Sequence, residues 1–396
     1  MQRRHYIDGL DGLRTLAVAV VMIYHLHYGW APGGLLGVGI FFVLSGYLIT
    51  GILLRQWNEN HQLDFKGFWI RRAKRLLPAL FTVLIAVSVW SYFFNQDQLP
   101  LIRKDSLAAV FYVSNWWYIF HDVSYFQSFS QRSPFEHLWS LAVEEQFYIF
   151  FPLLLWVGLR WMSNSKWLLG LSLGLAVVSA SLMAWLFEPG IDPSRVYFGT
   201  DTRSFALLIG CALAILHQSH ALKEPISKTK RWLMDALGMV CLIILLGFIF
   251  GVSEYNVFLF RGGLVLLSII SAILIAVIVQ PTSMLGSFFA WKPLKWLGER
   301  SYGIYLWHFP VIILSNPISN VAGIQWLRII LQIFITIVLA TVSYRWIENP
   351  IRYGTISRPG DCEKLRCDLS WNSFFGSAYS SRWSRYEGCS FDSEGK

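Results

Sequence analysis

Charged side chains are scarce in this sequence, at 14% of its 396 residues, whereas soluble domains carry about 25%. Hydrophobic residues make up 55%, and 19 Trp and 29 Phe are among them. Aromatic rings favour lipid and its interfaces with water. Apolar segments follow one another too closely for separate soluble domains. The composition therefore predicts an all-α fold, a polytopic bundle of membrane helices.

Cysteine patterns that mark disulfide or metal sites are also missing. The five cysteines follow neither a disulfide framework nor a zinc-ligand spacing. Cys211 and Cys241 lie inside apolar runs, where a free cysteine packs as a small hydrophobic residue. The other three, Cys362, Cys367 and Cys389, fall near the end of the chain. We expect no metal site.

Two further signals are absent. The net charge of +9 is spread over short loops and forms no basic patch interleaved with aromatics, which argues against nucleic acid as a partner. No small-x-small cleavage site follows the apolar stretch at 16–24, and Asp8 and Asp11 precede it. A signal peptide is therefore disfavoured, and an uncleaved first span is expected.

A helix needs about 20 apolar residues to cross the hydrocarbon core of a bilayer. The ten predicted spans are 12–29, 34–55, 76–94, 137–158, 167–187, 203–217, 232–252, 261–280, 301–316 and 325–347. An eleventh segment, 107–120, is short, rich in aromatics and contains Ser114 and Asn115, so an interfacial or re-entrant helix is expected there.

Loop charges predict the orientation of these spans. With ten spans and a cytoplasmic N-terminus, every inside segment carries more basic than acidic residues, and the outside segments together are close to neutral. An extra span at 107–120 would move the basic segment 217–231 outside. The positive-inside rule therefore favours ten spans with both ends inside.

His25 and Arg14 are polar residues of the first span, where ionisable side chains are expensive and usually functional. They are eleven residues apart, which brings them to within about 20° on one helix face and about 16 Å apart along its axis. Asp8, Asp11 and Arg14 form an i, i+3 series that can pair locally. The alternative for His25 is a hydrogen-bonded residue at the outer interface.

The segment 137–148 places His137, Ser140, Glu144 and Tyr148 on one helix face, with Glu145 beside them. Adjacent carboxylates are costly to bury together, so one is expected to pair or to be protonated. A carboxylate that orients an imidazole is a common general-base arrangement. The alternative is a structural pair with His137 or with a loop arginine.

Basic residues cluster before the third span, at Arg71, Arg72, Lys74 and Arg75. Such clusters at a membrane edge are commonly topology signals and lipid contacts. Guanidinium groups are also what the phosphates of a nucleotide require. The residues alone leave both interpretations open.

Two polar sites lie in later spans. Arg203 at the outer end of the sixth span is a candidate to clamp an anionic or polyol group, or to cap Asp201. Tyr305 and His308 share a face of the ninth span with Ser301, and His308 is either a second functional imidazole or a hydrogen-bonded core histidine. Separately, the glycines between 33 and 51 are expected to allow close helix packing.

Together these segments resemble the acyltransferase-3 family of bacterial membrane O-acyltransferases over residues 6–353. Any one motif is weak, but seven in register are specific. The motifs are Leu10-Asp11-Gly12-Leu13-Arg14 with His25, Gly37 through Ile49, Arg71 through Pro78, Leu138 through Tyr148, Thr202-Arg203, Ser301 through Pro310, and Trp346 through Pro350.

The resemblance implies transfer of an acyl group, commonly acetyl, from cytoplasmic acyl-CoA to a hydroxyl of an extracytoplasmic glycan such as lipopolysaccharide O-antigen. It implies the bacterial inner membrane as the location and acyl-CoA as a co-substrate, with no bound cofactor. His25 looks like the catalytic imidazole, as base or as transient acyl carrier, and Glu144 or Glu145 would orient the base or the acceptor. The arginines implied at the acyl-CoA end are Arg14, Arg71, Arg72 and Arg75, and the acceptor-side candidates are Arg203, Tyr305 and His308.

The chain departs from the family after residue 353. Relatives of the O-antigen type continue into an eleventh span and an SGNH hydrolase-like domain, whereas residues 354–396 are polar and aromatic without periodicity. We expect this tail to be poorly ordered and the gene product to be truncated or altered.

Two other functions fit the same buried polar residues, a transporter or exporter of a glycan or small solute and a non-catalytic partner in glycan assembly.

Overall fold

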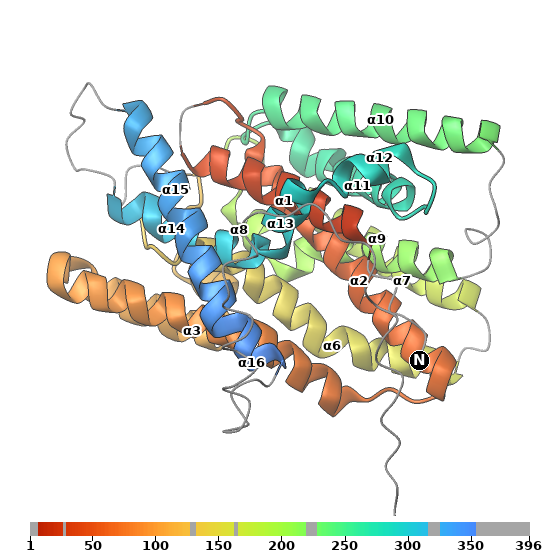
Figure 1. Ribbon diagram of the computed structural model, residues 1–396, viewed down its shortest axis with the longest axis horizontal. Coiled ribbons are helices and arrows are strands. Elements are labelled where there is room, and N and C mark those ends of the chain that lie inside the picture. The colour runs from red at the N-terminus through yellow and green to blue at the C-terminus, as the bar shows by residue number, and fades with distance from the viewer. Residues whose placement is uncertain are drawn as a thin grey trace, which may run out of the picture. The chain divides into compact units, whose positions relative to one another are not determined.

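The computed structural model describes residues 7–26, 29–126, 132–161, 165–218, 228–315 and 325–353. All regular structure within these ranges is helical, so the predicted all-α membrane bundle is confirmed (Figure 1). The predicted tail 354–396 lies outside the described residues. The longer helices are α1 (Asp8–His25), α2 (Gly37–Asn60), α3 (Phe65–Phe94), α4 (Leu99–Val110), α6 (Trp139–Trp161), α7 (Ser165–Leu186), α9 (Thr200–Gln218), α10 (Lys228–Gly251), α11 (Leu264–Ile278), α14 (Ser301–Ser315) and α15 (Gln325–Ser343).

Short helical elements connect the long helices. The short α-helices are α5 (Ser114–Phe120), α8 (Ser194–Phe198), α12 (Met284–Phe289), α13 (Lys292–Glu299) and α16 (Asn349–Tyr353). Single 3-10 turns lie at Gly34–Leu36, Gln96–Gln98 and Glu136–Leu138, and π turns at Leu259–Gly263 and Tyr344–Glu348.

Every predicted span corresponds to one long helix of the bundle. Seven helical segments among the described residues are long and apolar enough to cross a membrane, and they contain α2, α3, α6, α7, α10, α11 and α15. The other three predicted spans are α1, α9 and α14, which have 18, 19 and 15 residues. The number of spans and the side on which the N-terminus lies stay predictions.

Segment 107–120 does not form one continuous helix. The α4 helix ends at Val110, Tyr112 adopts a left-handed conformation (φ 51°), and α5 begins at Ser114. Asp105 on α4 accepts a hydrogen bond from the Trp117 indole of α5 at 3.0 Å, which holds the two short helices together. Burial raises the pKa of the Asp105 carboxyl.

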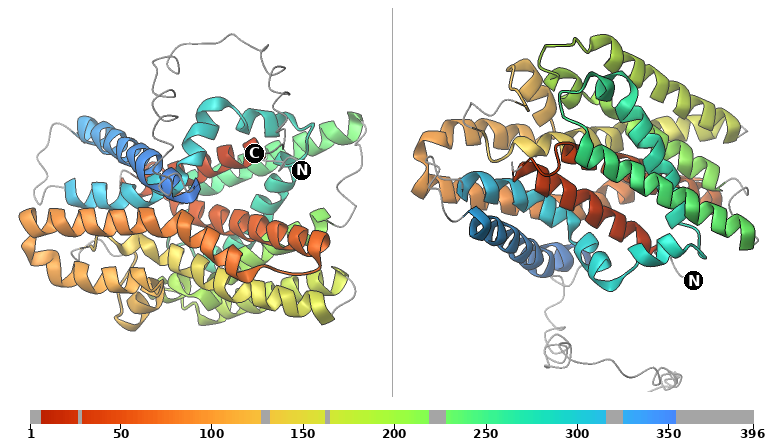
Figure 2. Two further views of the ribbon diagram at one scale, coloured as in Figure 1. Left: turned by 60° about the horizontal axis from the view of Figure 1, so that its bottom comes forward. Right: turned by 90° about the horizontal axis from the view of Figure 1, so that it is seen from above.

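The first helix lies inside the bundle. It packs against α2, α11, α12, α13 and α14, and the two figures show neighbouring helices on both sides of it (Figures 1 and 2). Because α1 begins at Asp8, earlier than predicted, two carboxylates lie in its first turn, where the helix dipole favours negative charge. Asp11 pairs with Arg14 at 3.0 Å, as the i, i+3 spacing predicts, and Asp8 pairs with Lys295 of α13 at 2.9 Å.

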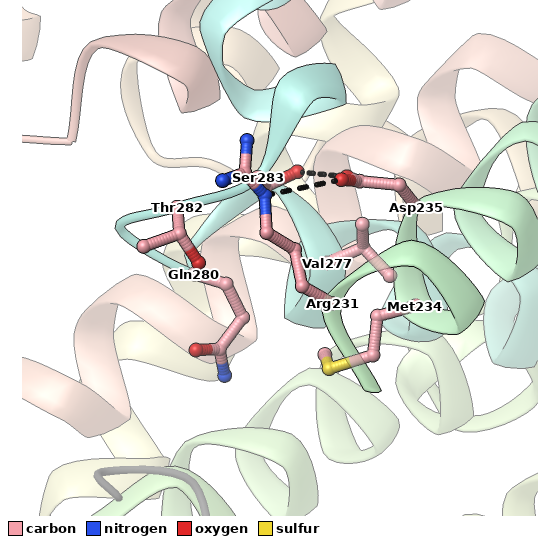
Figure 3. A pocket seen from close by; sticks show the side chains of 7 residues that line it. All are labelled: Arg231, Met234, Asp235, Val277, Gln280, Thr282 and Ser283. Atoms are coloured by element: carbon pink, nitrogen blue, oxygen red, sulfur yellow. Dashed lines mark hydrogen bonds and ion pairs between the residues drawn. The ribbon is translucent and has the colours of Figure 1, made fainter. Parts of the chain in front are cut away.

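A small pocket between α10 and α11 is lined by residues whose hydrogen bonds tie α10 to α12 (Figure 3). Asp235 of α10 accepts a hydrogen bond from the Ser283 hydroxyl at 2.8 Å and from the backbone N–H of Met284 at 3.1 Å. Nε of Arg231, one helical turn earlier, lies 3.9 Å from Oδ2 of Asp235. The carboxylate therefore satisfies backbone donors at the N-terminus of α12, which gives this pocket a structural role.

Glycine permits the close approach of α2 and α9. A Cβ added to Gly46 of α2 would lie 1.9 Å from the carbonyl oxygen of Leu207, and one added to Gly210 of α9 would lie 2.1 Å from that of Val43. The predicted packing role is confirmed at Gly46. It is wrong at Gly51, around which the space is open.

We expect Gly46→Ala to destabilise the purified protein by about 1–3 kcal/mol, because the backbones of α2 and α9 must separate. The matched control is Gly51→Ala, which adds the same methyl group to the same helix without a clash. The apparent unfolding temperature in detergent, followed by tryptophan fluorescence, compares the two. Equal stability of the two variants would contradict the close approach.

Candidate functional site

His25 is the last residue of α1 and is buried, with 2% of its surface exposed. Its Nδ1 lies 3.0 Å from Nε2 of His308 on α14, and its Nε2 lies 3.1 Å from the hydroxyl of Tyr125. The ring of Phe309 packs edge-on against it at 4.8 Å. The structure thus brings His25 and His308, predicted separately from two distant spans, into direct hydrogen-bond contact.

The α14 side of this site is anchored on the start of α6. The Tyr305 hydroxyl donates to the backbone carbonyl of His137 at 2.8 Å and lies 2.6 Å from the Ser140 hydroxyl. The His137 ring stands 5.3 Å from the ring of His308 and 5.4 Å from that of Tyr305, and its two nitrogens have no hydrogen-bond partner among the described residues. Tyr305 therefore fixes α14, and with it His308, against α6.

Glu144 lies deeper along α6 and accepts a hydrogen bond from the Ser45 hydroxyl of α2 at 3.0 Å. Tyr148, one turn further on, reaches the same carboxylate at 3.5 Å. Neither Glu144 nor Glu145 hydrogen bonds to His25 in the described part of the chain. The imidazole is instead oriented by another imidazole and by a phenol.

Glu145 forms a two-pronged ion pair with Arg72 of α3. The Nη2 and Nε atoms of Arg72 donate to Oε1 of Glu145 at 2.7 and 2.9 Å, and both side chains are largely buried. The guanidinium also stacks on the ring of Tyr148, with its carbon 3.3 Å from the ring centre. Of the two interpretations of these carboxylates, Glu145 takes the structural one, a pair with a nearby arginine.

Arg75, one turn beyond Arg72, is the centre of a group of cations. Its charged neighbours include Arg14, Arg72 and Arg352, and Glu348 is a carboxylate close to it. Within the described ranges Arg75 forms no hydrogen bond and no ion pair. We call Arg14, Arg72, Arg75 and Arg352 the arginine cluster, since they bring four positive charges together from α1, α3 and α16.

Arg71 lies apart from this group. Its side chain is 60% exposed and reaches Asp64 at 3.3 Å, near the start of α3. That carboxylate also caps α3 by accepting the backbone N–H of Gly67 at 2.7 Å. Of the arginines predicted together, the structure therefore gathers Arg14, Arg72 and Arg75 and leaves Arg71 on the surface.

Arg203 is 1% exposed at the interface of α9 and α2. Its guanidinium carbon lies 5.0 Å from the ring centre of Tyr197 and 5.8 Å from that of Phe42, and its Nε and Nη1 have no acceptor among the described residues. Asp201 pairs with Arg195 at 2.7 Å, so the interpretation of Arg203 as a cap for Asp201 is wrong. Its cation–π contacts are the interactions that the structure shows.

Tyr125 and Ser45 are polar contacts of the site that the sequence did not single out. Tyr125 lies in a non-helical segment that follows α5, and its backbone N–H donates to the Ser194 hydroxyl at 2.9 Å. No spacing along the chain relates it to His25, a hundred residues earlier. Ser45 lies beside Gly46 in α2, and no spacing along the chain relates it to Glu144.

The two groups of residues lie at opposite ends of α1. Arg14 and the arginine cluster lie near its N-terminal end, and His25 with His308 and Tyr125 at its C-terminal end. Eleven residues of helix separate the two by about 16 Å. No group of three metal-binding side chains occurs among the described residues. The arrangement therefore offers a cationic site and a buried imidazole, joined by one helix.

A family model described as an acyltransferase domain matches residues 7–345. The chain is 49% identical over 349 residues to the peptidoglycan O-acetyltransferase of Listeria monocytogenes, with 88% of this chain and 56% of that protein covered. A Bacillus subtilis protein provisionally named a peptidoglycan O-acetyltransferase is 48% identical over 352 residues, with 89% and 56% covered. A Staphylococcus aureus protein provisionally named an O-acetyltransferase is 42% identical, with 89% and 58% covered.

The chain thus spans little more than half the length of the curated relatives that it matches. No solved structure matches it.

We expect Glu145→Gln to lower the stability of the protein by on the order of 3 kcal/mol, because it leaves the buried Arg72 without its counter-ion. The double variant Glu145→Gln with Arg72→Gln removes both charges and should recover much of that loss. Apparent unfolding temperatures of the three proteins in detergent test this. A double variant no more stable than Glu145→Gln would show that the pair is not the source of the effect.

Proposed function

Because this chain belongs to the acyltransferase-3 family, we propose that it is a membrane O-acetyltransferase. In this proposal it moves an acetyl group from cytoplasmic acetyl-CoA to a hydroxyl group of a glycan outside the membrane. The observation that carries it is the pair of sites on α1, cations at one end and a buried, hydrogen-bonded imidazole at the other.

The arginine cluster suits the phosphates of the donor. Guanidinium groups bind phosphate through paired, charge-assisted hydrogen bonds. Arg72 is already occupied by Glu145, whereas Arg75 forms no hydrogen bond in the described part of the chain. We therefore assign Arg75 to the phosphates and Arg72 to holding α3 against α6. Arg14, which is paired with Asp11, adds positive charge beside Arg75. The face of α1 between Arg14 and His25 would line the path of the pantetheine arm.

His25 suits the chemical step. As a general base it takes the proton of the acceptor hydroxyl while the hydroxyl oxygen attacks the thioester carbonyl carbon. The carbon–sulfur bond then breaks, and the departing CoA thiolate takes the proton from the imidazolium. The alternative role, in which His25 carries the acetyl group transiently, uses the same ring nitrogen and the same donor.

Peptidoglycan is the acceptor that we favour. The Listeria monocytogenes and Bacillus subtilis relatives carry peptidoglycan O-acetyltransferase names, and nothing in the structure favours lipopolysaccharide O-antigen, the acceptor expected from the sequence. Both acceptors lie outside the bacterial cytoplasmic membrane. We propose that the protein itself lies in that membrane. The reaction needs the bilayer, acetyl-CoA and a glycan as partners.

His25→Ala should reduce acetylation of the cell wall at least 100-fold, since a positioned base contributes about 10²–10⁴ in rate. The assay expresses the chain in cells that lack their own peptidoglycan O-acetyltransferase and measures acetate released from purified wall by mild base. The control is His121→Ala, an exposed histidine outside the site. Full acetylation by His25→Ala, at the same amount of protein in the membrane, would show that His25 takes no part in the chemistry. Transport of a solute by the wild-type chain without acetylation would favour a transporter.

Arg75→Gln should weaken binding of acetyl-CoA, raising its KM by about 10–100-fold, because a charge-assisted hydrogen bond contributes about 1.5–3 kcal/mol. The turnover rate at saturating donor should change little, since Arg75 lies far from His25. Arg160→Gln, at the exposed end of α6, serves as the control. The measurement is acetyl-CoA-dependent acetylation in membrane vesicles at varied donor concentration. An unchanged KM would place the donor elsewhere.

A further inference from the structure

The hydrogen bonds around His25 and His308 determine which ring nitrogen of His25 carries the proton and which carries the lone pair. We propose that His308 is a positioning residue that holds neutral His25 in its Nδ1–H form, so that Nε2 is the nitrogen presented to the reacting groups. The catalytic meaning of this proposal rests on the proposed acetyl transfer. For two neutral imidazoles, the proton arrangement itself follows from the geometry.

The first step is at the backbone of α14. Nδ1 of His308 lies 2.6 Å from the carbonyl oxygen of Tyr305, one turn earlier on the same helix. A carbonyl oxygen only accepts hydrogen bonds, so Nδ1 of His308 must carry the proton. In a neutral imidazole the other nitrogen is then an acceptor. Nε2 of His308 therefore carries a lone pair.

The second step is the contact between the two rings. Nδ1 of His25 lies 3.0 Å from Nε2 of His308, a normal hydrogen-bond length. Since Nε2 of His308 accepts, Nδ1 of His25 must donate. Neutral His25 is then the Nδ1–H form, and its Nε2 has the lone pair. The Tyr125 hydroxyl, 3.1 Å away, donates to this nitrogen.

Burial makes the arrangement specific. His25 and His308 are 2% and 0% exposed, and the rings of Phe309 and His137 pack at 4.8 Å from the first and 5.3 Å from the second. Reversing the proton order would turn Nδ1 of His308 into an acceptor facing the Tyr305 carbonyl. An unsatisfied polar contact of that kind is expensive in a buried site.

The His308 imidazole takes the place that a carboxylate holds in a Ser-His-Asp triad, where the carboxylate orients the histidine and fixes its tautomer. A carboxylate here would add a negative charge to the interior of a membrane protein, which is costly. The neutral imidazole orients His25 without that charge. When Nε2 of His25 accepts a proton, the positive charge is shared through its Nδ1–H with His308 and the Tyr305 carbonyl.

Two variants separate orientation from packing. In His308→Gln, the amide oxygen reaches the former Nε2 position and accepts the Nδ1–H of His25. In His308→Asn, which is one methylene shorter, the amide stays near the Tyr305 carbonyl and does not reach His25. We expect Gln to keep most of the turnover rate and Asn to lower it about 100-fold, with an unchanged KM for acetyl-CoA in both.

The proton positions are read directly by nitrogen NMR of the full chain in detergent, labelled with ¹⁵N-histidine. The chain has nine histidines, and the signals of His25 are those lost in His25→Gln. In wild type and in His308→Gln, His25 should have a protonated Nδ1 and an unprotonated Nε2. His308→Asn should show the Nε2–H form, which a free imidazole side chain prefers.

Failure of the positioning role of His308 and failure of the proposed acetyl transfer give different results. A wild-type His25 with its proton on Nε2 would overturn the positioning role of His308 even if the chain transfers acetyl groups. A His308→Asn variant as active as His308→Gln would overturn it as well. A protonated Nδ1 together with no acetyl transfer by wild type would instead sustain the hydrogen-bond order and overturn the proposed function.

Discussion

The candidate site depends on one constraint, that a polar group buried in a membrane protein is costly unless it finds a partner within the protein. Atoms of Arg203 and His137 are exceptions among the described residues. The ion pair between Arg72 and Glu145 is the clearest case, since each side chain is largely buried and three hydrogen bonds join them. Asp11 with Arg14 follows the same rule within one helix. His25 and His308 follow it through the hydrogen bond between their two rings. The Arg72–Glu145 pair joins α3 to α6, and the His25–His308 pair joins α1 to α14.

The sequence predicts the helices of this bundle well because hydropathy has a direct physical cause. A segment that must satisfy its backbone internally and face lipid has to be helical and apolar, so the ten predicted spans reappear as ten long helices. The failure of 107–120 to form a single helix agrees with its short length and its polar residues. The π turn before α11 was not foreseen, since its irregularity lies in the backbone of Gly262.

The candidate site was predictable only where its residues repeat at helical spacing. Arg14 with Asp11, and Tyr305 with His308, each lie on one helix face, and sequence spacing is enough to relate them. The partners of His25 come from two other parts of the chain, and no local pattern links Tyr125 or His308 to it. The same is true of Arg72 and Glu145, whose pairing depends on how α3 packs against α6.

The neutral pair of His25 and His308 has a consequence for energetics across the membrane. Moving one elementary charge through the membrane potential changes the free energy by about 2.3 kcal/mol per 100 mV. In the proposed reaction the charged phosphates of CoA stay with the arginine cluster, and an uncharged acetyl group passes to the other side. A resting site without net charge gives the electric field nothing to act on. Acetyl transfer would then be electrically silent, driven by the thioester alone at any membrane voltage.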